Sequence, residues 1–297
     1  MASRAPVVHL IDGPVYVFRA YHSLPPMRAP DGTPTNAAYG YANTLLKYLA
    51  QVEATHAAVA FDFSDQSFRN AIEPGYKAQR GETPPDLAPQ FDLCMELTRA
   101  LGLEVYVLPD FEADDLIATL AERLLAQRAS AVIVTTDKDL AQLVREDGRV
   151  NLYDLARDEL RDADAVRARF GVDPEQIPDY LGLVGDAVDN LPGVPGVGPK
   201  SAAAALRRFG SIEGIPADAA AWSDAGVRGA ASVAARIEAH RERALLTRSL
   251  ATLRRDVPGI ASELSGLVWR GADRAAIEPL FARLGWGKIA TRIPRWA

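Results

Sequence analysis

Short apolar runs alternate along the chain with segments in which apolar residues recur every three or four positions. Four of the runs have the length of buried strands: Val7–Ile11, Ala57–Phe61, Leu103–Leu108 and Ala131–Thr135. The segments between them, such as Tyr39–Gln51 and Ala113–Gln127, have the periodicity of amphipathic helices. Strands that alternate with helices predict an α/β fold with a mostly parallel central sheet flanked by helices.

Acidic residues recur where the predicted strands end and where the helix after residue 112 begins. They are Asp12, Asp62, Glu112, Asp114, Asp115, Asp137 and Asp139. In parallel sheets, ligands bind outside the carboxyl ends of the strands, so we expect these side chains to meet at one edge. Each residue alone has an ordinary explanation as a turn residue or a helix cap. Together they would repel one another strongly without a cation, so the set predicts a site for hard divalent metal ions.

Asp186 and Asp189 extend this set to nine carboxylates. Their spacing predicts that both project from one turn of a helix. An all-oxygen ligand set favours Mg²⁺, or Mn²⁺ in its place, over zinc. The single cysteine and the four histidines argue against a disulfide within the chain and against a structural zinc site.

The net charge of −6 hides a division along the chain. Residues 1–199 carry 17 basic and 30 acidic side chains, and residues 200–297 carry 16 and 9, so their net charges are −13 and +7. The first region could hold metal and the second a polyanion such as DNA, with chance unevenness as the alternative. The 297 residues allow one large domain or two smaller ones. Because no stretch resembles a transmembrane span or a signal peptide, we expect a soluble cytoplasmic protein.

A segment rich in glycine and proline lies between Asp62 and the predicted helix Gln90–Leu101. Tyr76, Lys77 and Arg80 stand close together in it. The spacing of the two cations predicts that they share a helix face, with the Tyr76 ring available for stacking. A solvated charged loop is the alternative, but the position directly after a predicted metal ligand favours a functional role.

The segment Leu191–Phe209, L-P-G-V-P-G-V-G-P-K-S-A-A-A-A-L-R-R-F, superficially matches a phosphate-binding P-loop. Pro199 breaks the match, because a P-loop needs lysine directly after its last glycine. We therefore predict a helix–hairpin–helix, whose glycines let backbone N–H groups approach a DNA phosphate and whose second helix begins with positive potential. The candidate DNA-binding residues are Gly193, Gly196, Gly198, Lys200 and Ser201.

The chain beyond the hairpin shows simpler patterns. Val233–Leu250 is rich in arginine and has a helical pattern. The four tryptophans are expected to be core or cap residues rather than platforms for base stacking; they are Trp222, Trp269, Trp286 and Trp296.

Ordered motifs between Val7 and about Pro258 resemble the 5′-nuclease family, which includes the 5′→3′ exonuclease domain of bacterial DNA polymerase I, its stand-alone relatives and flap endonucleases. The motifs are D-G-P-V-Y-V-F-R-A-Y, A-F-D, F-R-N-A-I-E-P-G-Y-K-A-Q-R, E-A-D-D, T-T-D-K-D-L-A-Q-L-V, G-D-A-V-D-N-L-P-G-V-P-G-V-G-P-K and L-A-T-L-R-R-D-V-P. Gly81 and Glu82 replace a more proline-rich stretch of the family. No polymerase module follows the motifs, as in a free-standing nuclease or in a segment of a longer chain.

The resemblance implies a PIN-like α/β nuclease core over residues 1–175, with a helical arch at about 64–95, and a helical DNA-binding subdomain over 176–297. It implies that the nine acidic residues line a two-metal site. Lys77 and Arg80 would lie on the arch beside that site, together with Tyr76, and Arg19 would face DNA. The hairpin Gly193–Gly198 would grip the duplex backbone, often with a bound K⁺ ion.

The implied activity is that of a structure-specific 5′→3′ exonuclease or flap endonuclease, as in primer removal and repair. Its substrate would be DNA, or RNA paired with DNA, near a 5′ end, flap or junction, and we expect a monomer without membrane association. A metal-dependent phosphatase would also use strand-end carboxylates, but it would not need the hairpin or the basic second region. A catalytically inert structure-specific DNA-binding protein is a further alternative, and the complete carboxylate set argues against it.

Overall fold

A computed structural model describes residues 5–223 and 226–297. At its centre lies a six-stranded sheet in the order β3-β2-β1-β4-β5-β6, in which β6 runs antiparallel to β5 and the other neighbours are parallel. The strands are β1 (Val7–Asp12), β2 (His56–Ala60), β3 (Glu104–Tyr106), β4 (Ser130–Val134), β5 (Val150–Asp154) and β6 (Glu159–Arg161). The four predicted strands are confirmed to within two residues at each end.

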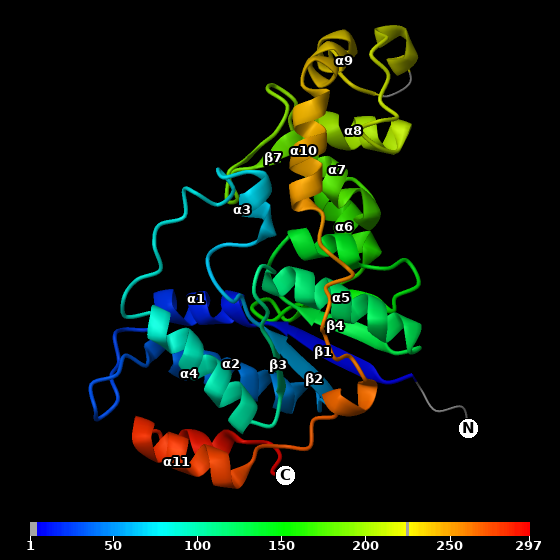
Figure 1. Ribbon diagram of the computed structural model, residues 1–297. Coiled ribbons are helices and arrows are strands. Elements are labelled where there is room, and N and C mark those ends of the chain that lie inside the picture. Colours follow the sequence, from blue (N-terminus) through cyan, green and yellow to red (C-terminus); the bar gives the residue numbers. More distant parts are fainter. Residues whose placement is uncertain (1–4, 224–225) are drawn as a thin grey trace.

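Alternate residues of the central strands face two different cores. In β1, Val8 and Leu10 belong to a core that also contains the apolar face of α5 (Ala113–Ala126). Ile11 belongs to a second core, formed with α1 (Gly13–Ser23), α2 (Asn36–Gln51) and α4 (Ala88–Ala100). Figure 1 shows α5 on one side of the strands and α2 and α4 on the other. Because both faces are covered, the strand ends are the part of the sheet that is open to a ligand.

The helical part comprises α6 (Ala163–Phe170), α7 (Ile177–Val184), α8 (Pro199–Phe209), α9 (Ala230–Ala239) and α10 (Arg241–Ala251). Leu181 and Leu250 pack in the same apolar core as α5, so this part is joined to the sheet by continuous packing. The predicted helical segment Val233–Leu250 is helical in the structure, but it is divided into α9 and α10, because His240 leaves the helical conformation at φ −121° and ψ 16°. Among the described helices, none combines the length and apolar character needed to cross a membrane.

A small antiparallel hairpin, β7 (Gly185–Asp186) and β8 (Leu191–Pro192), follows α7. The residues between its two strands form a turn, so Asp186 and Asp189 do not project from one helical turn as predicted. Helix α7 ends at Gly185, whose φ of 80° lies in the left-handed region that favours glycine. The hairpin therefore begins where that glycine stops the helix.

The predicted arch, residues 64–95, contains little helix. Its helical parts are α3 (Phe68–Ile72) and the first half of α4, and residues 74–79 form turns. Lys77 has a φ of 55°, so Lys77 and Arg80 do not share a helix face as predicted. Figure 1 shows the segment between α3 and α4 as an irregular chain that spans from the helical part to the sheet.

The C-terminal residues return to the α/β core instead of joining the helices that follow the hairpin. The Trp269 backbone N–H donates to the Thr55 carbonyl at 2.8 Å, and its indole N–H donates to the Leu101 carbonyl at 2.9 Å. Helix α11 (Arg274–Leu284) packs below α4, where its side chains join the second core. Residues 269–293 therefore pack in the second core of the sheet, and the prediction of core tryptophans is confirmed for Trp222, Trp269 and Trp286.

Two glycines of the loop between β8 and α8 are expected to differ in how far their substitution by alanine changes stability. A Cβ on Gly193 would lie 2.2 Å from the carbonyl carbon of Val184, whereas a Cβ on Gly198 would meet no atom within 4 Å. We expect Gly193→Ala to lower the free energy of unfolding by about 1–3 kcal/mol, as overpacking does, and Gly198→Ala to change it by less than about 0.5 kcal/mol. Urea denaturation measures both values. Equal losses of unfolding free energy in the two variants would contradict this packing of Gly193 against α7.

Candidate metal centre

The first group of carboxylates lies at the carboxyl edge of the sheet. Asp12 ends β1, is 3% exposed, and accepts a hydrogen bond from the Thr135 hydroxyl at 2.7 Å. Asp62 follows β2 and accepts from the Ala113 backbone N–H, also at 2.7 Å. Asp137 follows β4 and accepts from the backbone N–H of Asp139 at 2.8 Å. Parallel strands thus place acids from distant parts of the sequence at one edge, as predicted.

Repulsion among these carboxylates is visible in their pKa values. Burial raises the pKa of Asp12 to about 7, and the charges of Asp137 and Asp62 add to this shift, although the hydrogen bond from Thr135 opposes it. Burial, and then the charges of Asp137 and Asp12, also hold the pKa of Asp114 well above its ordinary value. Four acids therefore share one electrostatic environment. A bound cation would favour their ionised forms.

A second group, the acidic triad of Asp139, Asp186 and Asp189, joins the sheet edge to the hairpin. One carboxylate oxygen of each lies within 4.8 Å of the other two, and all three residues are buried. Asp139 Oδ1 is buried and accepts no hydrogen bond. Burial raises the pKa of Asp139 to about 8, with a further contribution from Asp137 and opposition from Lys138. Buried, close oxygens with an unused acceptor fit a hard divalent cation.

Cations of the arch segment contact both ends of this carboxylate array. Lys77 Nζ donates to Glu112 at 2.7 Å and lies 4.0 Å from Asp189, which also forms an ion pair with Arg80. Burial alone would raise the pKa of Glu112, but the charges of Lys77 and Arg69 lower it to about 2. The structure therefore brings the two predicted catalytic cations to the acidic residues.

Backbone contacts also fasten the arch segment to the hairpin. The Lys77 N–H donates to the Asp189 carbonyl at 3.0 Å, and the Asn190 side chain donates to the Gly75 carbonyl at 2.7 Å. Tyr76 is 4% exposed, and its single hydroxyl proton is shared between carboxylate oxygens of Glu112 and Asp189, each 3.2 Å from the hydroxyl oxygen. The expectation that the Tyr76 ring is available for stacking is therefore not met, because the ring is buried. Its position suits it to hold the two acids.

Asp115 is placed differently from the sequence-based prediction. Its two oxygens accept from the Arg69 guanidinium at 2.7 Å each, and one also accepts from the Arg254 backbone N–H at 2.8 Å. Arg69 is 1% exposed and donates as well to the Leu250 carbonyl at 2.7 Å. This ion pair ties α3 and α5 to the end of α10, so Asp115 has no free oxygen for direct metal binding.

Two further charged residues at the carboxylates, Arg69 and Lys138, were not among the residues predicted from the sequence. Arg69 lies in the five-residue helix α3, whose sequence gives no signal that an arginine is buried. Lys138 stands between two predicted ligands in T-T-D-K-D, and its position inside that motif was the available signal. In the structure Lys138 contacts Asp186 and lies 3.5 Å from Asp139 Oδ1.

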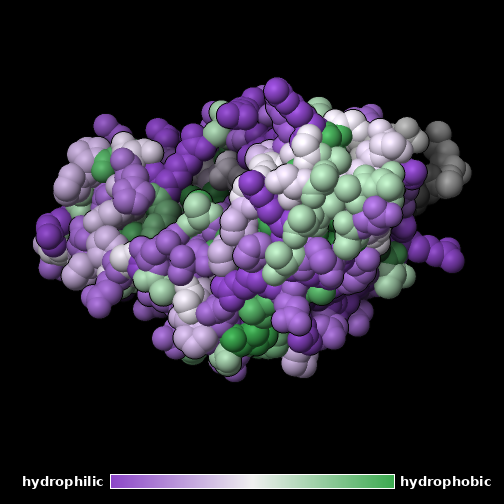
Figure 2. All heavy atoms as spheres, turned by 90° about the horizontal axis from the view of Figure 1, so that it is seen from above, coloured by the Kyte–Doolittle hydropathy of each residue, from purple (hydrophilic) through white to green (hydrophobic). Residues whose placement is uncertain are grey.

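The candidate DNA-binding residues lie outside the carboxylate array. Gly198 precedes the first residue of α8 without a side-chain cap, and Lys200 is exposed and Ser201 half-buried in the first turn. The open N-terminus of α8 therefore presents backbone N–H groups to the outside. Gly196 has a φ of 75°, and its carbonyl accepts from Arg236. Figure 2 looks down on this end of the molecule and shows a mostly hydrophilic face with smaller hydrophobic patches.

Arg19 is exposed on α1 and also lies apart from the carboxylates. It lines a groove of about 440 Å³ together with Asn43 of α2 and Arg292 near the C-terminus. The family resemblance implies a DNA contact for Arg19. The groove brings a second arginine, Arg292, to that surface, and no local pattern in the sequence indicates this.

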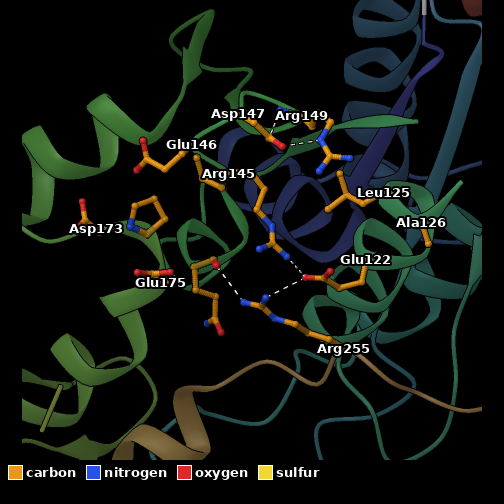
Figure 3. A pocket seen from close by; sticks show the side chains of 13 residues that line it. Glu122, Leu125, Ala126, Arg145, Glu146, Asp147, Arg149, Asp173, Glu175 and Arg255 are labelled. Atoms are coloured by element: carbon orange, nitrogen blue, oxygen red, sulfur yellow. Dashed lines mark hydrogen bonds and ion pairs between the residues drawn. The ribbon is translucent and has the colours of Figure 1, made fainter. Parts of the chain in front are cut away.

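A larger hollow, of about 980 Å³, lies away from the predicted site residues, between α5 and residues 173–175. Figure 3 shows Glu122 held between Arg145 and Arg255, and Asp147 paired with Arg149. Glu146 and Asp173, which also line the hollow, pair with Arg167, so four of its five acidic side chains are held by arginines. The chemistry of the molecule is therefore assigned to the carboxylates and not to this hollow.

Removing one buried acid should change how stability depends on pH. Because the pKa of Asp12 is about 7 in the folded protein and about 4 when unfolded, its ionisation destabilises the fold as pH rises through this interval. Asp12→Asn can keep the bond from Thr135. In chelator we expect it to melt close to wild type at pH 4 and at least about 2–4 °C higher at pH 8, the shift that about 1 kcal/mol produces.

Thermal melts across this pH range measure the difference. Asp92→Asn is the matched control, because Asp92 is an exposed carboxylate on α4, and its pH dependence should equal that of wild type. A lower melting temperature for Asp12→Asn than for wild type at pH 8 would contradict the repulsive cluster.

Comparison with known proteins gives one consistent family. Residues 7–171 match the family described as 5′-3′ exonuclease, N-terminal resolvase-like domain, and residues 172–275 match 5′-3′ exonuclease, C-terminal SAM fold. DNA polymerase I of Bacillus caldotenax is 39% identical over 279 residues, which are 93% of this chain and 31% of that protein. The chain thus spans about a third of such polymerases. The 5′-3′ exonuclease of Aquifex aeolicus is 39% identical over 208 residues, 70% of this chain and 71% of that protein.

Solved structures share the fold at lower identity. The bacteriophage T5 flap endonuclease in complex with DNA and metal ions is 22% identical, with a TM-score of 0.66 over 84% of this chain and 89% of that one. The catalytic core of Rad2 in complex with DNA substrate is 15% identical, with a TM-score of 0.63 over 95% of this chain and 89% of that one. On the two consecutive family matches and the identity to the Aquifex protein, the chain belongs to the 5′-3′ exonuclease family.

Proposed function

We propose that this chain is a divalent-metal-dependent nuclease that hydrolyses phosphodiester bonds of DNA near 5′ ends, flaps or junctions. One observation carries the proposal: acids from the sheet edge and from the hairpin meet beside Lys77 and Arg80. The names of the Aquifex and T5 relatives support the reaction, and the DNA complexes of T5 flap endonuclease and Rad2 support the substrate. Action on RNA paired with DNA, as in primer removal, is part of the same proposal.

The carboxylates divide into two groups that would hold two Mg²⁺ ions, or Mn²⁺ in their place. Asp12, Asp62, Asp114 and Asp137 form the group at the sheet edge, and the acidic triad forms the other. Such ions supply Lewis acidity toward the scissile phosphate when bound. Mg²⁺ retains several waters, so some of these acids would act through water. Glu112 and Asp115, which are held by Lys77 and Arg69, would position the array.

Lys77 and Arg80 would contribute positive charge at the reacting phosphate. Both lie beside the acids on a segment that reaches them from one side, and Arg80 is half exposed. Donors placed where negative charge develops lower the barrier more than they strengthen substrate binding. Tyr76 would support them by holding Glu112 and Asp189 with its hydroxyl. The described residues place no histidine at the array, so no conventional histidine base is invoked.

DNA would be held by the helical part and by α1. The open N-terminus of α8 offers backbone N–H groups next to Gly198, with Lys200 and Ser201 in its first turn. The net charge of +7 over residues 200–297 supports a polyanionic ligand. Arg19 would contact the DNA strand outside the metal centre. The family resemblance suggests a K⁺ ion at the loop Gly193–Gly198. We further propose that the chain acts as a monomer with a nuclease core and a hairpin-containing DNA-binding region.

A direct assay tests this proposal and the roles of the two cations. Wild type should release a labelled product from a 5′-labelled DNA flap in Mg²⁺ and should release no product in chelator. Lys77→Ala and Arg80→Ala should slow single-turnover cleavage by about one to three orders of magnitude while duplex binding changes little, because their charge is directed at the reacting phosphate. Cleavage within about twofold of wild type would remove them from the reaction.

Lys200→Ala is the matched comparison, since it also removes one positive charge. It should weaken binding to all sequences alike and reduce the slope of log K against log salt by about one, with cleavage of saturated enzyme retained. An absence of cleavage by wild type on any flapped, nicked or gapped substrate would overturn the nuclease proposal, and turnover of a small phosphate ester alone would favour a phosphatase.

A further inference from the structure

Lys138 is the cation built most directly into the acidic triad. Its Nζ donates to Asp186 Oδ2 and lies 3.5 Å from Asp139 Oδ1, the buried oxygen that accepts no hydrogen bond. Its side chain is 30% exposed, whereas the side chains of Asp139 and Asp186 are 12% and 4% exposed. The proposed reaction gives Lys138 no role.

The two acids that Lys138 contacts come from different parts of the fold. Asp139 begins the short 3-10 helix Asp139–Leu143 that follows β4, and Asp186 lies in the first strand of the hairpin. A Lys138 ammonium between them joins the α/β core to the hairpin. Asp189, the third member, has its own ion pair with Arg80. Within the described residues, the triad is therefore neutralised from two sides.

We infer that Lys138 is a resident counter-ion of the acidic triad, which holds the hairpin on the core when no divalent ion is bound and lowers the affinity of the triad for such an ion. The inference rests on the proposed function in one respect, namely that a divalent cation binds these three acids. It makes Lys138 a positioning residue that acts through Asp139 and Asp186 and not on the substrate.

Loss of the Lys138 ammonium should have opposite effects on the stability of the metal-free protein and on metal affinity. Three buried carboxylates without a cation repel one another, so loss of the ammonium should destabilise the metal-free hairpin. The same ammonium repels a divalent ion that binds the same oxygens, so its loss should strengthen metal binding. The flexible lysine stem and the partial exposure of Lys138 let the ammonium move toward solvent as the ion enters.

The test compares Lys138→Met, which keeps the apolar stem, with Lys138→Arg, which keeps the charge. Mn²⁺ binding is measured by titration calorimetry, and exchange of the backbone amides of residues 185–191 is measured in chelator. We expect Lys138→Met to bind Mn²⁺ about three- to tenfold more tightly, to exchange faster in the hairpin and to melt at a lower temperature without metal. Lys138→Arg should resemble wild type. A residue needed only for folding would weaken metal binding when lost.

Two further variants keep the test decisive. Lys138→Gln retains an N–H donor toward Asp186 and should show tighter Mn²⁺ binding with a smaller loss of stability, which covers the case in which Lys138→Met does not fold in chelator. Lys288→Met, which removes an exposed lysine elsewhere, should leave all measurements unchanged.

Equal or weaker Mn²⁺ binding by Lys138→Met and Lys138→Gln would overturn the inference, as would unchanged hairpin exchange. If wild type itself binds no Mn²⁺, the proposed metal centre fails and the inference fails with it. If wild type binds Mn²⁺ and the Lys138 variants bind it identically, the inference alone fails.

Discussion

Buried carboxylates repel one another at one edge of the sheet, and the packing of the molecule holds them together against that repulsion. The acids at the sheet edge and in the triad are held by strands and helices whose packing is settled elsewhere, in two cores on opposite faces of the sheet. The raised pKa of Asp12 and of Asp139 shows that burial disfavours their ionised forms. The free-energy cost of ionising these acids arises at one edge of the sheet, where a bound cation would offset it.

Built-in cations limit that cost and connect the parts of the molecule. Arg69 of α3 binds Asp115 of α5 through two hydrogen bonds and also donates to the Leu250 carbonyl of α10. It therefore joins these three helices. Removal of one partner from a buried pair of this kind typically costs about 3–5 kcal/mol. Lys77 and Arg80 fasten the same segment to the hairpin. The position of the proposed catalytic cations is thus set by the ion pairs that neutralise the acids.

The sequence predicts the sheet and most of the acidic set because both follow from local patterns. Apolar runs mark the strands, and an acid after each run falls at the carboxyl edge by the geometry of a parallel sheet. Asp114 and Asp115 could not be separated by residue type. Neighbours on a helix point about 100° apart, however, and this rotation directs Asp115 toward Arg69, whose burial only the tertiary structure reveals. The i, i+3 spacing of Asp186 and Asp189 suits a turn as well as a helix. Because Gly185 ends helix α7 before Asp186, the two acids lie in the hairpin and not on a helix. The return of Trp269 and α11 to the sheet depends on contacts far apart in the chain, which no local pattern encodes.

The central claim is that acids from the sheet edge and from the hairpin form one divalent-metal centre. The most direct measurement is an anomalous-difference map from crystals of this protein soaked in Mn²⁺, with crystals in chelator as the reference. The account predicts peaks among Asp12, Asp62, Asp114 and Asp137 and within the triad of Asp139, Asp186 and Asp189. Peaks confined to exposed surface carboxylates, or no peak at either group, would contradict it.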